Sequence, residues 1–168
     1  CESGVTLNSL TSSVGDSFTQ FGSEISGAPG VLRCSYAASA VGGSTTFTLT
    51  TGSAFRKAVV AVEISGAHTS PEDKTASAIE TSTPTAHSSG NTAATSVADE
   101  ILVGAGIWDA GGQAGVTDGS WVAQKKQTGS GTAMGVIVDT RIVATSAVYA
   151  YPYTTASGSN HVVAIFTF

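Results

Sequence analysis

The three histidines are the side chains in this sequence that are best suited to general acid–base chemistry. His68 and His87 lie in a polar stretch, and His161 precedes the apolar run that closes the sequence. A hydrolytic triad needs a serine beside a histidine that a carboxylate orients, but no Gly-x-Ser-x-Gly nucleophile elbow is present. We therefore interpret all three histidines as solvent-facing polar residues and expect a protein that is not an enzyme.

Carboxylates are the second group with chemical potential. Glycoside hydrolysis needs two of them roughly 5 to 10 Å apart across a cleft, and Glu63 is conspicuous because it interrupts an apolar segment. An outward or sheet-edge position beside a lysine or threonine explains Glu63 more simply. Calcium prefers carboxylate oxygens, but Asp109, Asp118 and Asp139 lack the spacing of an EF-hand loop. We expect no metal and no cofactor.

Aromatic side chains offer the best candidates for ligand binding, because sugars usually stack on exposed aromatic faces. Tyr149, Tyr151 and Tyr153 recur with period two and would share one face of a strand. Packing in the core or between subunits explains this stripe at least as well. The candidate ligand-binding residues are Trp108, Asp109, Tyr151 and Tyr153.

Two cysteines permit at most one disulfide, between Cys1 and Cys34. Their isolation argues against CxxC redox chemistry and against zinc binding. A mature bacterial lipoprotein also begins with an acylated cysteine, so lipid anchoring through Cys1 is an alternative. The simplest interpretation is that residues upstream of Cys1 are missing, so that the chain begins after processing or within a longer polypeptide.

Composition favours strands and argues against two kinds of partner. The 168 residues have the size of one domain, and such a domain buries roughly 70% of its unfolded surface. Charged residues make up 11% of the chain, and an excess of Thr, Ser, Gly, Ala and Val favours strands and turns. A net charge of −5 gives no electrostatic basis for binding nucleic acid or an anionic membrane. No apolar run approaches the roughly 20 residues that span a bilayer.

Two apolar runs predict the core strands that must position these residues. Residues 57–66 place valine and isoleucine on one face and mostly small or apolar residues on the other, which predicts a strand covered on both sides. The run 101–108 has the same character, and we expect it to pair with 57–66. Gly104 and Gly106 within it indicate the close approach of another backbone, or a bulge.

Alternating apolar residues and Gly-containing turns predict about ten short strands and no helix. Besides the two core strands, these cover residues 5–10, 17–21, 31–38, 44–50, 121–128, 132–143, 148–153 and 161–168, with irregular pieces at 75–83 and 92–96. A hairpin turn is expected at Gly129-Ser-Gly131. The predicted fold class is all-β, an antiparallel two-sheet β-sandwich that is jelly-roll-like and forms a single domain over residues 1–168.

Several strand and turn patterns recur in order along most of the chain. They are Tyr36–Ser39, Gly42–Thr50, Val60–Gly66, Asp99–Gly104, Gly119–Trp121 and Val163–Phe168. Together they resemble a broad family of jelly-roll domains found on phage virion proteins and on secreted bacterial surface proteins. That family often places Pro-Leu-Asp after the central strand, where this chain has Pro71-Glu72-Asp73, so an apolar contact is missing there.

The resemblance implies a non-enzymatic virion structural protein, a capsid decoration, fibre or tail module located on the virion surface. Its partners would be other virion proteins or copies of itself, and a homo-oligomer is expected. The alternative is a carbohydrate-binding or adhesin domain on a bacterial cell surface, with a cell-surface glycan as partner. A glycan hydrolase that uses Glu63 and Asp109 is the third hypothesis.

Overall fold

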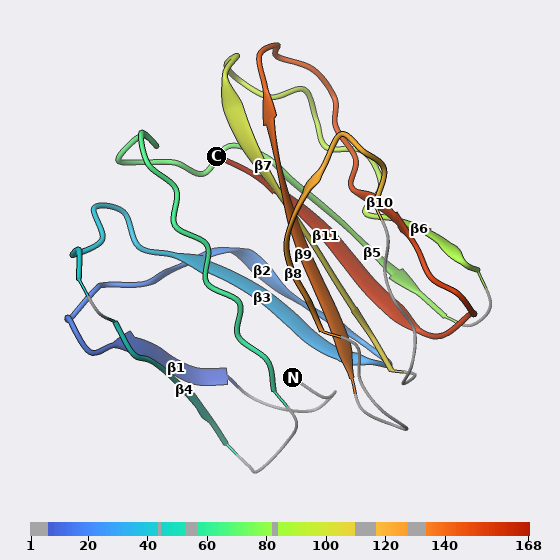
Figure 1. The fold of residues 1–168 in the computed structure, drawn as a ribbon, viewed down its shortest axis with the longest axis horizontal. Helices are drawn as coiled ribbons and strands as arrows, with labels where there is room; N and C mark the ends of the chain where they lie inside the picture. Colours follow the sequence, from blue (N-terminus) through green and yellow to red (C-terminus); the bar gives the residue numbers. More distant parts are fainter. Residues whose placement is uncertain (1–6, 44, 53–56, 82–83, 110–116, 128–133) are drawn as a thin grey trace.

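The computed structural model describes residues 7–43, 45–52, 57–81, 84–109, 117–127 and 134–168. Within these ranges the chain forms strands and no helix: β1 (Leu7–Ser12), β2 (Thr19–Gly27), β3 (Gly30–Tyr36), β4 (Phe47–Thr51), β5 (Thr75–Glu80), β6 (Ala86–Ser88), β7 (Glu100–Trp108), β8 (Val122–Gln127), β9 (Gly135–Val143), β10 (Pro152–Thr154) and β11 (His161–Thr167). All strand pairs are antiparallel, which confirms the expected all-β, sandwich-like fold class (Figure 1).

Five strands form the main sheet, in the order β5-β11-β7-β9-β8. β11 lies inside this sheet, where Phe166 faces Thr75 of β5 on one side and Val103 of β7 on the other. β7 also pairs with β9 along its whole length. Because successive residues of a strand point to opposite faces, these interior strands supply side chains to two separate buried layers.

The first layer lies between the main sheet and the β2–β3 hairpin. Its buried residues from the sheet are Ala105, Ile107, Val136, Val138, Val162, Ala164 and Phe166. Phe21 of β2 meets the rings of Phe166 and Phe168 edge to face, with centroid distances of 5.3 and 5.0 Å. The hairpin closes where Gly27 pairs with Gly30.

The second layer lies between the main sheet and a cover formed by β6, β10 and their neighbours. Beyond the β6–β10 pair, Ser89 N–H donates to Tyr151 O at 3.0 Å and Thr92 N–H donates to Tyr149 O at 2.8 Å. Residues 92–96, expected to be an irregular strand, make individual bonds of this kind without forming a strand.

Glycines of the main sheet let large rings of the second layer lie directly on the backbone. A Cβ atom on Gly104 would lie 2.1 Å from the Tyr151 ring, and one on Gly106 would lie 2.7 Å from the Tyr153 ring. The close approach expected at these two glycines is confirmed, although the approaching group is an aromatic ring and not a backbone.

Residues 57–66 do not form the buried central strand that their composition predicts. Figure 1 draws them as an extended coil, and the neighbours of β7 are β9 and β11. Val60 and Val62 pack onto the first layer, whereas Val59 is 49% exposed. The segment is covered on one side because its other face carries the Glu63 carboxylate, which would be costly to bury without a partner.

β6 (Ala86–Ser88) forms where no strand was expected, and the remaining strands agree with expectation apart from their ends. β2 continues to Gly27 instead of ending at Phe21, and β10 covers only part of the expected 148–153 strand. The turn at 129–131 lies outside the described residues. No helix in the described part of the chain is long and apolar enough to cross a membrane.

Candidate functional site

The rings predicted to bind a ligand lie inside the second layer. Trp108, Tyr151 and Tyr153 are 0%, 0% and 1% exposed. The ligand-binding prediction depended on exposed ring faces, and these rings have none. Their surroundings are those of the packing alternative: Trp121 meets Tyr151 edge to face, with centroids 4.8 Å apart, and Tyr149 packs half-buried against the same cluster.

Asp109, the fourth candidate, is half-exposed at the end of β7. Its Oδ1 accepts a hydrogen bond from the Asn160 backbone N–H at 3.2 Å, and its Oδ2 accepts one from the Asn160 side chain at 2.5 Å. Asp109 therefore fastens the end of β7 to the turn that precedes β11. This contact positions the backbone of the turn, and both oxygens of the Asp109 carboxylate accept a hydrogen bond from Asn160.

Two histidines, expected to face solvent, are buried in the second layer. His87 of β6 and His161 of β11 are 3% and 0% exposed. Their rings stack with centroids 3.5 Å apart and planes inclined by 26°. The prediction of solvent-facing histidines is thus wrong for these two, whereas His68 is exposed and accepts a hydrogen bond from Ser70 N–H at 3.0 Å.

His87 stands between a carboxylate and a hydroxyl, the order found in a catalytic triad. Its Nδ1 lies 2.5 Å from Oε2 of Glu80, and its Nε2 lies 3.0 Å from Oγ1 of Thr155. The Thr155 hydroxyl, however, donates its hydrogen to Ser157 O at 3.0 Å. Since this hydrogen is already used, Nε2 of His87 must donate to Thr155 and cannot act as its base.

The same geometry joins Nδ1 of His87 to the Glu80 carboxylate. Both partners belong to the β5–β6 region, and Ser88 N–H also donates to Glu80 at 3.4 Å. The cluster therefore ties β6 to β5 and serves as a polar fastening of the cover.

His161 has two hydroxyl partners. Its Nδ1 lies 2.6 Å from the Tyr153 hydroxyl and its Nε2 lies 2.9 Å from the Ser159 hydroxyl. Burial, and next the positive field of the stacked His87, lower the pKa of His161 to about 4, although the Asp109 carboxylate opposes this shift. His161 is therefore neutral at physiological pH.

Sequence reasoning missed these buried histidines although one signal was present. The alternation that places Val163 and Ile165 on one face of the closing strand places His161 on that face too, in a layer that is buried. For His87 no such signal exists, because its burial depends on pairing with Tyr153, which lies far along the chain.

A second polar cluster joins two loops at the other end of the sheet. Asp73 Oδ1 accepts from Lys74 Nζ and from Ser96 Oγ at 2.5 Å each, and Asp73 Oδ2 accepts from Ser96 N–H at 2.6 Å. Burial would raise the pKa of Asp73, but these hydrogen bonds outweigh it and lower the pKa to about 2. Asp73 is therefore ionised.

Glu100, which is 2% exposed, lies beside Asp73. Burial raises the pKa of Glu100, as does the neighbouring Asp73 carboxylate, whereas Val97 N–H lowers it. Two carboxyl groups can hydrogen-bond only if one is protonated, and the proton resides on Glu100 because Asp73 has the cationic and N–H donors. Proton sharing of this kind is found in hydrolytic dyads, but here Glu100 is buried, Asp73 is half-buried, and both groups bind loops.

Replacing Glu100 by glutamine tests this assignment. Because the pKa of Glu100 is raised in the folded state, the contribution of this group to stability should be lost as pH rises from the ordinary glutamate pKa of 4.5 through the raised value, in opposition to the contribution of His161. Glu100→Gln supplies a permanent N–H donor, so this loss should be absent and the stability of the variant relative to the wild type should rise over this interval.

Urea unfolding between pH 4 and pH 9 measures both profiles. Glu24→Gln, a change at a partly exposed carboxylate paired with Arg33 at 3.4 Å, is the control and should retain the wild-type slope. A Glu100→Gln protein with the same alkaline-side slope as the wild type would refute the shared proton.

Among the described residues, the other acids do not assemble a metal site. Asp139 is fully buried and accepts a hydrogen bond from the Tyr151 hydroxyl at 2.8 Å, and burial raises its pKa. Asp118 accepts from Ser120 in its own turn, and Glu63 is exposed as expected. Across the described ranges, no three His, Cys, Asp or Glu side chains group closely enough to hold a metal ion.

The predicted disulfide cannot be placed, because Cys1 lies outside the described residues. Cys34 is a half-buried thiol on β3. Burial, and next the Glu72 carboxylate, raise the pKa of Cys34 to about 12, so the thiol is protonated and unreactive at neutral pH.

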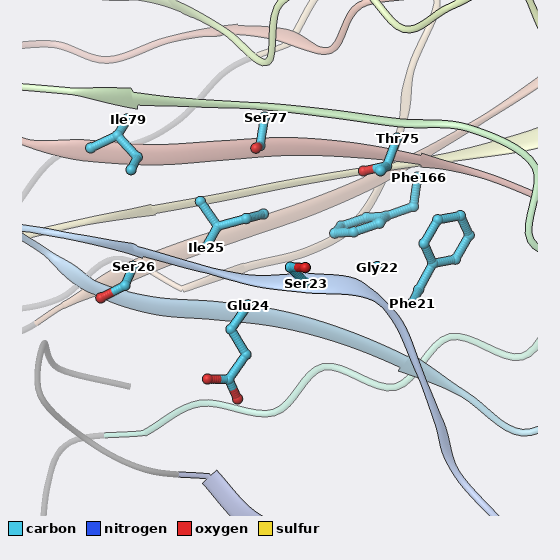
Figure 2. Close-up of a pocket in the computed structure, with 10 residues that line it drawn as sticks. All are labelled: Phe21, Gly22, Ser23, Glu24, Ile25, Ser26, Thr75, Ser77, Ile79 and Phe166. Atoms are coloured by element: carbon cyan, nitrogen blue, oxygen red, sulfur yellow. The ribbon is translucent and has the colours of Figure 1, made fainter.

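A groove of about 570 Å³ separates the edge of β2 from the edge of β5 (Figure 2). It exists because β2 bulges between Phe21 and Ile25, and it narrows where Gly27 meets Ile79. In Figure 2 the side chain of Ile25 extends into this space, whereas Glu24 extends away from it. The groove has the volume of a small-ligand pocket but brings together no acid–base pair.

Comparisons with protein-family models, with curated proteins and with solved structures each found no match to this chain.

Proposed function

We propose that the chain is a non-enzymatic structural module of a virion, displayed on the capsid, tail or fibre, that works through contacts with copies of itself or with a shell protein. One observation carries the proposal: the side chains best suited to chemistry are directed inward. His87 and His161 fasten the cover of the second layer, and Asp73 and Glu100 join two loops. These arrangements stabilise a rigid β-sandwich and leave no convergent reactive groups among them.

The surface supports contacts with proteins more than contacts with charged ligands. Charged residues are 11% of the chain, and apolar side chains of the main sheet reach solvent, including Val122 at 63% and Ile142 at 80% exposure. Such residues suit protein interfaces, because the cores of interfaces are depleted in charged groups. The resemblance to jelly-roll domains of phage virion proteins favours a virion as the assembly.

The carbohydrate-binding alternative rests on aromatic residues that are buried. Trp108, Tyr151 and Tyr153 would be reached by a glycan only after the second layer opened. Substituting them by alanine removes core packing at a cost of about 3–5 kcal/mol, so a loss of glycan binding in such variants would not identify a site.

The proposal is tested on the assembly that carries the protein. Particles are purified by density gradient, their proteins are identified by mass spectrometry, and the particles are imaged by cryo-electron microscopy. We expect copies of this chain in symmetric arrays, with the cell-envelope fraction of the same culture as control. Particles without the protein would refute the proposal. Scattered copies on the cell envelope with an acyl mass on Cys1 would establish the adhesin alternative instead.

A further inference from the structure

Residues 57–66 have the sequence of a strand but no strand partner in the described part of the chain. Valine and isoleucine recur with period two, and the backbone is extended. Among the described residues, none of its N–H or C=O groups belongs to a sheet ladder or to another backbone hydrogen bond. An extended, unpaired edge of this kind is a template for pairing with another strand.

The segment is fixed in place and presents one face outward. Val60, Val62 and Ile64 are half-buried, and the first two pack on the first layer. Lys57 and Glu63 lie on the alternate, exposed face with Val59 and Ala61 between them. The inward side chains hold the backbone at the surface, so a partner strand would add to it without dislodging the core.

The exposed face is complementary to itself in the antiparallel sense. Pairing two copies about Val60 places Lys57 opposite Glu63 of the second copy and, by symmetry, Glu63 opposite Lys57 of that copy. Val59 then lies opposite Ala61 of the second copy. Opposite charges in directly facing positions stabilise antiparallel pairs, and like charges destabilise them.

We infer that residues 57–64 form a strand-pairing surface whose partner is the same segment of a second copy, related by a two-fold axis through Val60. An isologous contact of this kind closes into a dimer. This strand-pairing surface deepens the proposed function, and it rests on the premise of that proposal that copies of this chain contact one another. Two other strand edges are less suited: β8 carries the adjacent Lys125 and Lys126, and β5 faces β2 across the groove.

Charge reversal and charge exchange test the register. Sedimentation equilibrium of the 168-residue chain should show a monomer–dimer equilibrium. Lys57→Glu and Glu63→Lys should each weaken dimerisation on the order of tenfold, because each places like charges opposite each other at both ends of the ladder. The double variant Lys57→Glu/Glu63→Lys restores opposite charges and should dimerise as the wild type does.

The controls separate pairing from simpler effects. Lys125→Glu changes the net charge as Lys57→Glu does, but on the exposed strand β8, and should leave dimerisation unchanged. Lys57 donates a hydrogen bond to the Thr51 hydroxyl at 2.9 Å, so circular dichroism of each variant checks that the fold survives. Amide hydrogen exchange of residues 57–64 should slow as wild-type concentration rises.

Three outcomes would overturn the inference. A wild type that stays monomeric at millimolar concentration has no such surface, although its presence on particles would still uphold the proposed function. A dimer that both reversals leave unchanged uses another surface. A double variant as weak as the single variants would refute the Lys57–Glu63 register.

Discussion

Replacing Gly104 by alanine is expected to lower the free energy of unfolding by about 3 kcal/mol or more. The new Cβ would lie 2.1 Å from Cδ2 of Tyr151, a distance that no relaxed structure tolerates. The ring cannot retreat, because it is fully buried and Trp121 packs against it at 4.8 Å. Overpacking a core typically costs 1–3 kcal/mol and occasionally more, and domains of this kind have roughly 5–15 kcal/mol to lose.

Urea denaturation followed by tryptophan fluorescence measures this loss. Gly119→Ala is the matched control, since its Cβ would meet nothing within 4 Å, and it should change stability by no more than about 0.5 kcal/mol. If Gly104→Ala does not fold, Gly104→Ala/Tyr151→Ala should be no less stable than Tyr151→Ala alone, because alanine lacks the Cγ, Cδ2 and Cε2 atoms that the new Cβ would meet. A Gly104→Ala protein as stable as the Gly119→Ala control would show that Tyr151 does not lie on this glycine.

Acidification from pH 6.5 to pH 4 is expected to remove about 3 kcal/mol of stability through His161. Burial, and next the stacked His87, lower its pKa in the folded state to about 4, whereas an unfolded histidine titrates near 6.5. Through His161 the unfolded chain therefore binds more protons in this interval, so the contribution of this residue to stability is full above pH 6.5 and falls as pH falls through the interval. Solvent does not screen this contribution, since His161 is fully buried.

The pH profile of unfolding, with and without the His161 ring, measures this contribution. His161→Gln can still contact Tyr153 and Ser159 but cannot titrate, so its profile between pH 6.5 and pH 4 should be flatter than that of the wild type. His68→Gln removes an exposed histidine and should keep the acid-side slope. Retention of the full slope in His161→Gln would assign the acid lability to another group.

Local sequence patterns predicted single strands and close contacts better than they predicted which strands are neighbours in a sheet. The alternation in 161–168 predicted a strand correctly, and Gly104 and Gly106 predicted a close contact. The run 57–66 has equally good strand character, yet it lies outside the main sheet. The prediction was wrong because a segment buried on one side and a strand buried inside a sheet have nearly the same sequence pattern. The charged Glu63 was the available sign that one face stays in water.

The polar clusters were harder to predict because each joins residues from distant parts of the chain. Glu80 and His87 come from one region, whereas Thr155 comes from another, and only the β6–β10 pairing brings them together. Likewise, Trp108 and Tyr151 are aromatic residues of the kind that bind sugars when their ring faces are exposed. Whether such rings face water or core depends on which segment covers the sheet, and composition does not encode that choice.

The position of β11 also has a consequence for how this fold is made in the cell. It follows all the other described strands in the sequence and yet lies between β5 and β7, so it supplies ladder hydrogen bonds to both. During synthesis β5 and β7 leave the ribosome long before β11, which lies between them in the sheet. Until then, the edges of β5 and β7 that pair with β11 remain unpaired. Nascent chains of this protein should therefore depend on chaperones until residues 161–167 emerge.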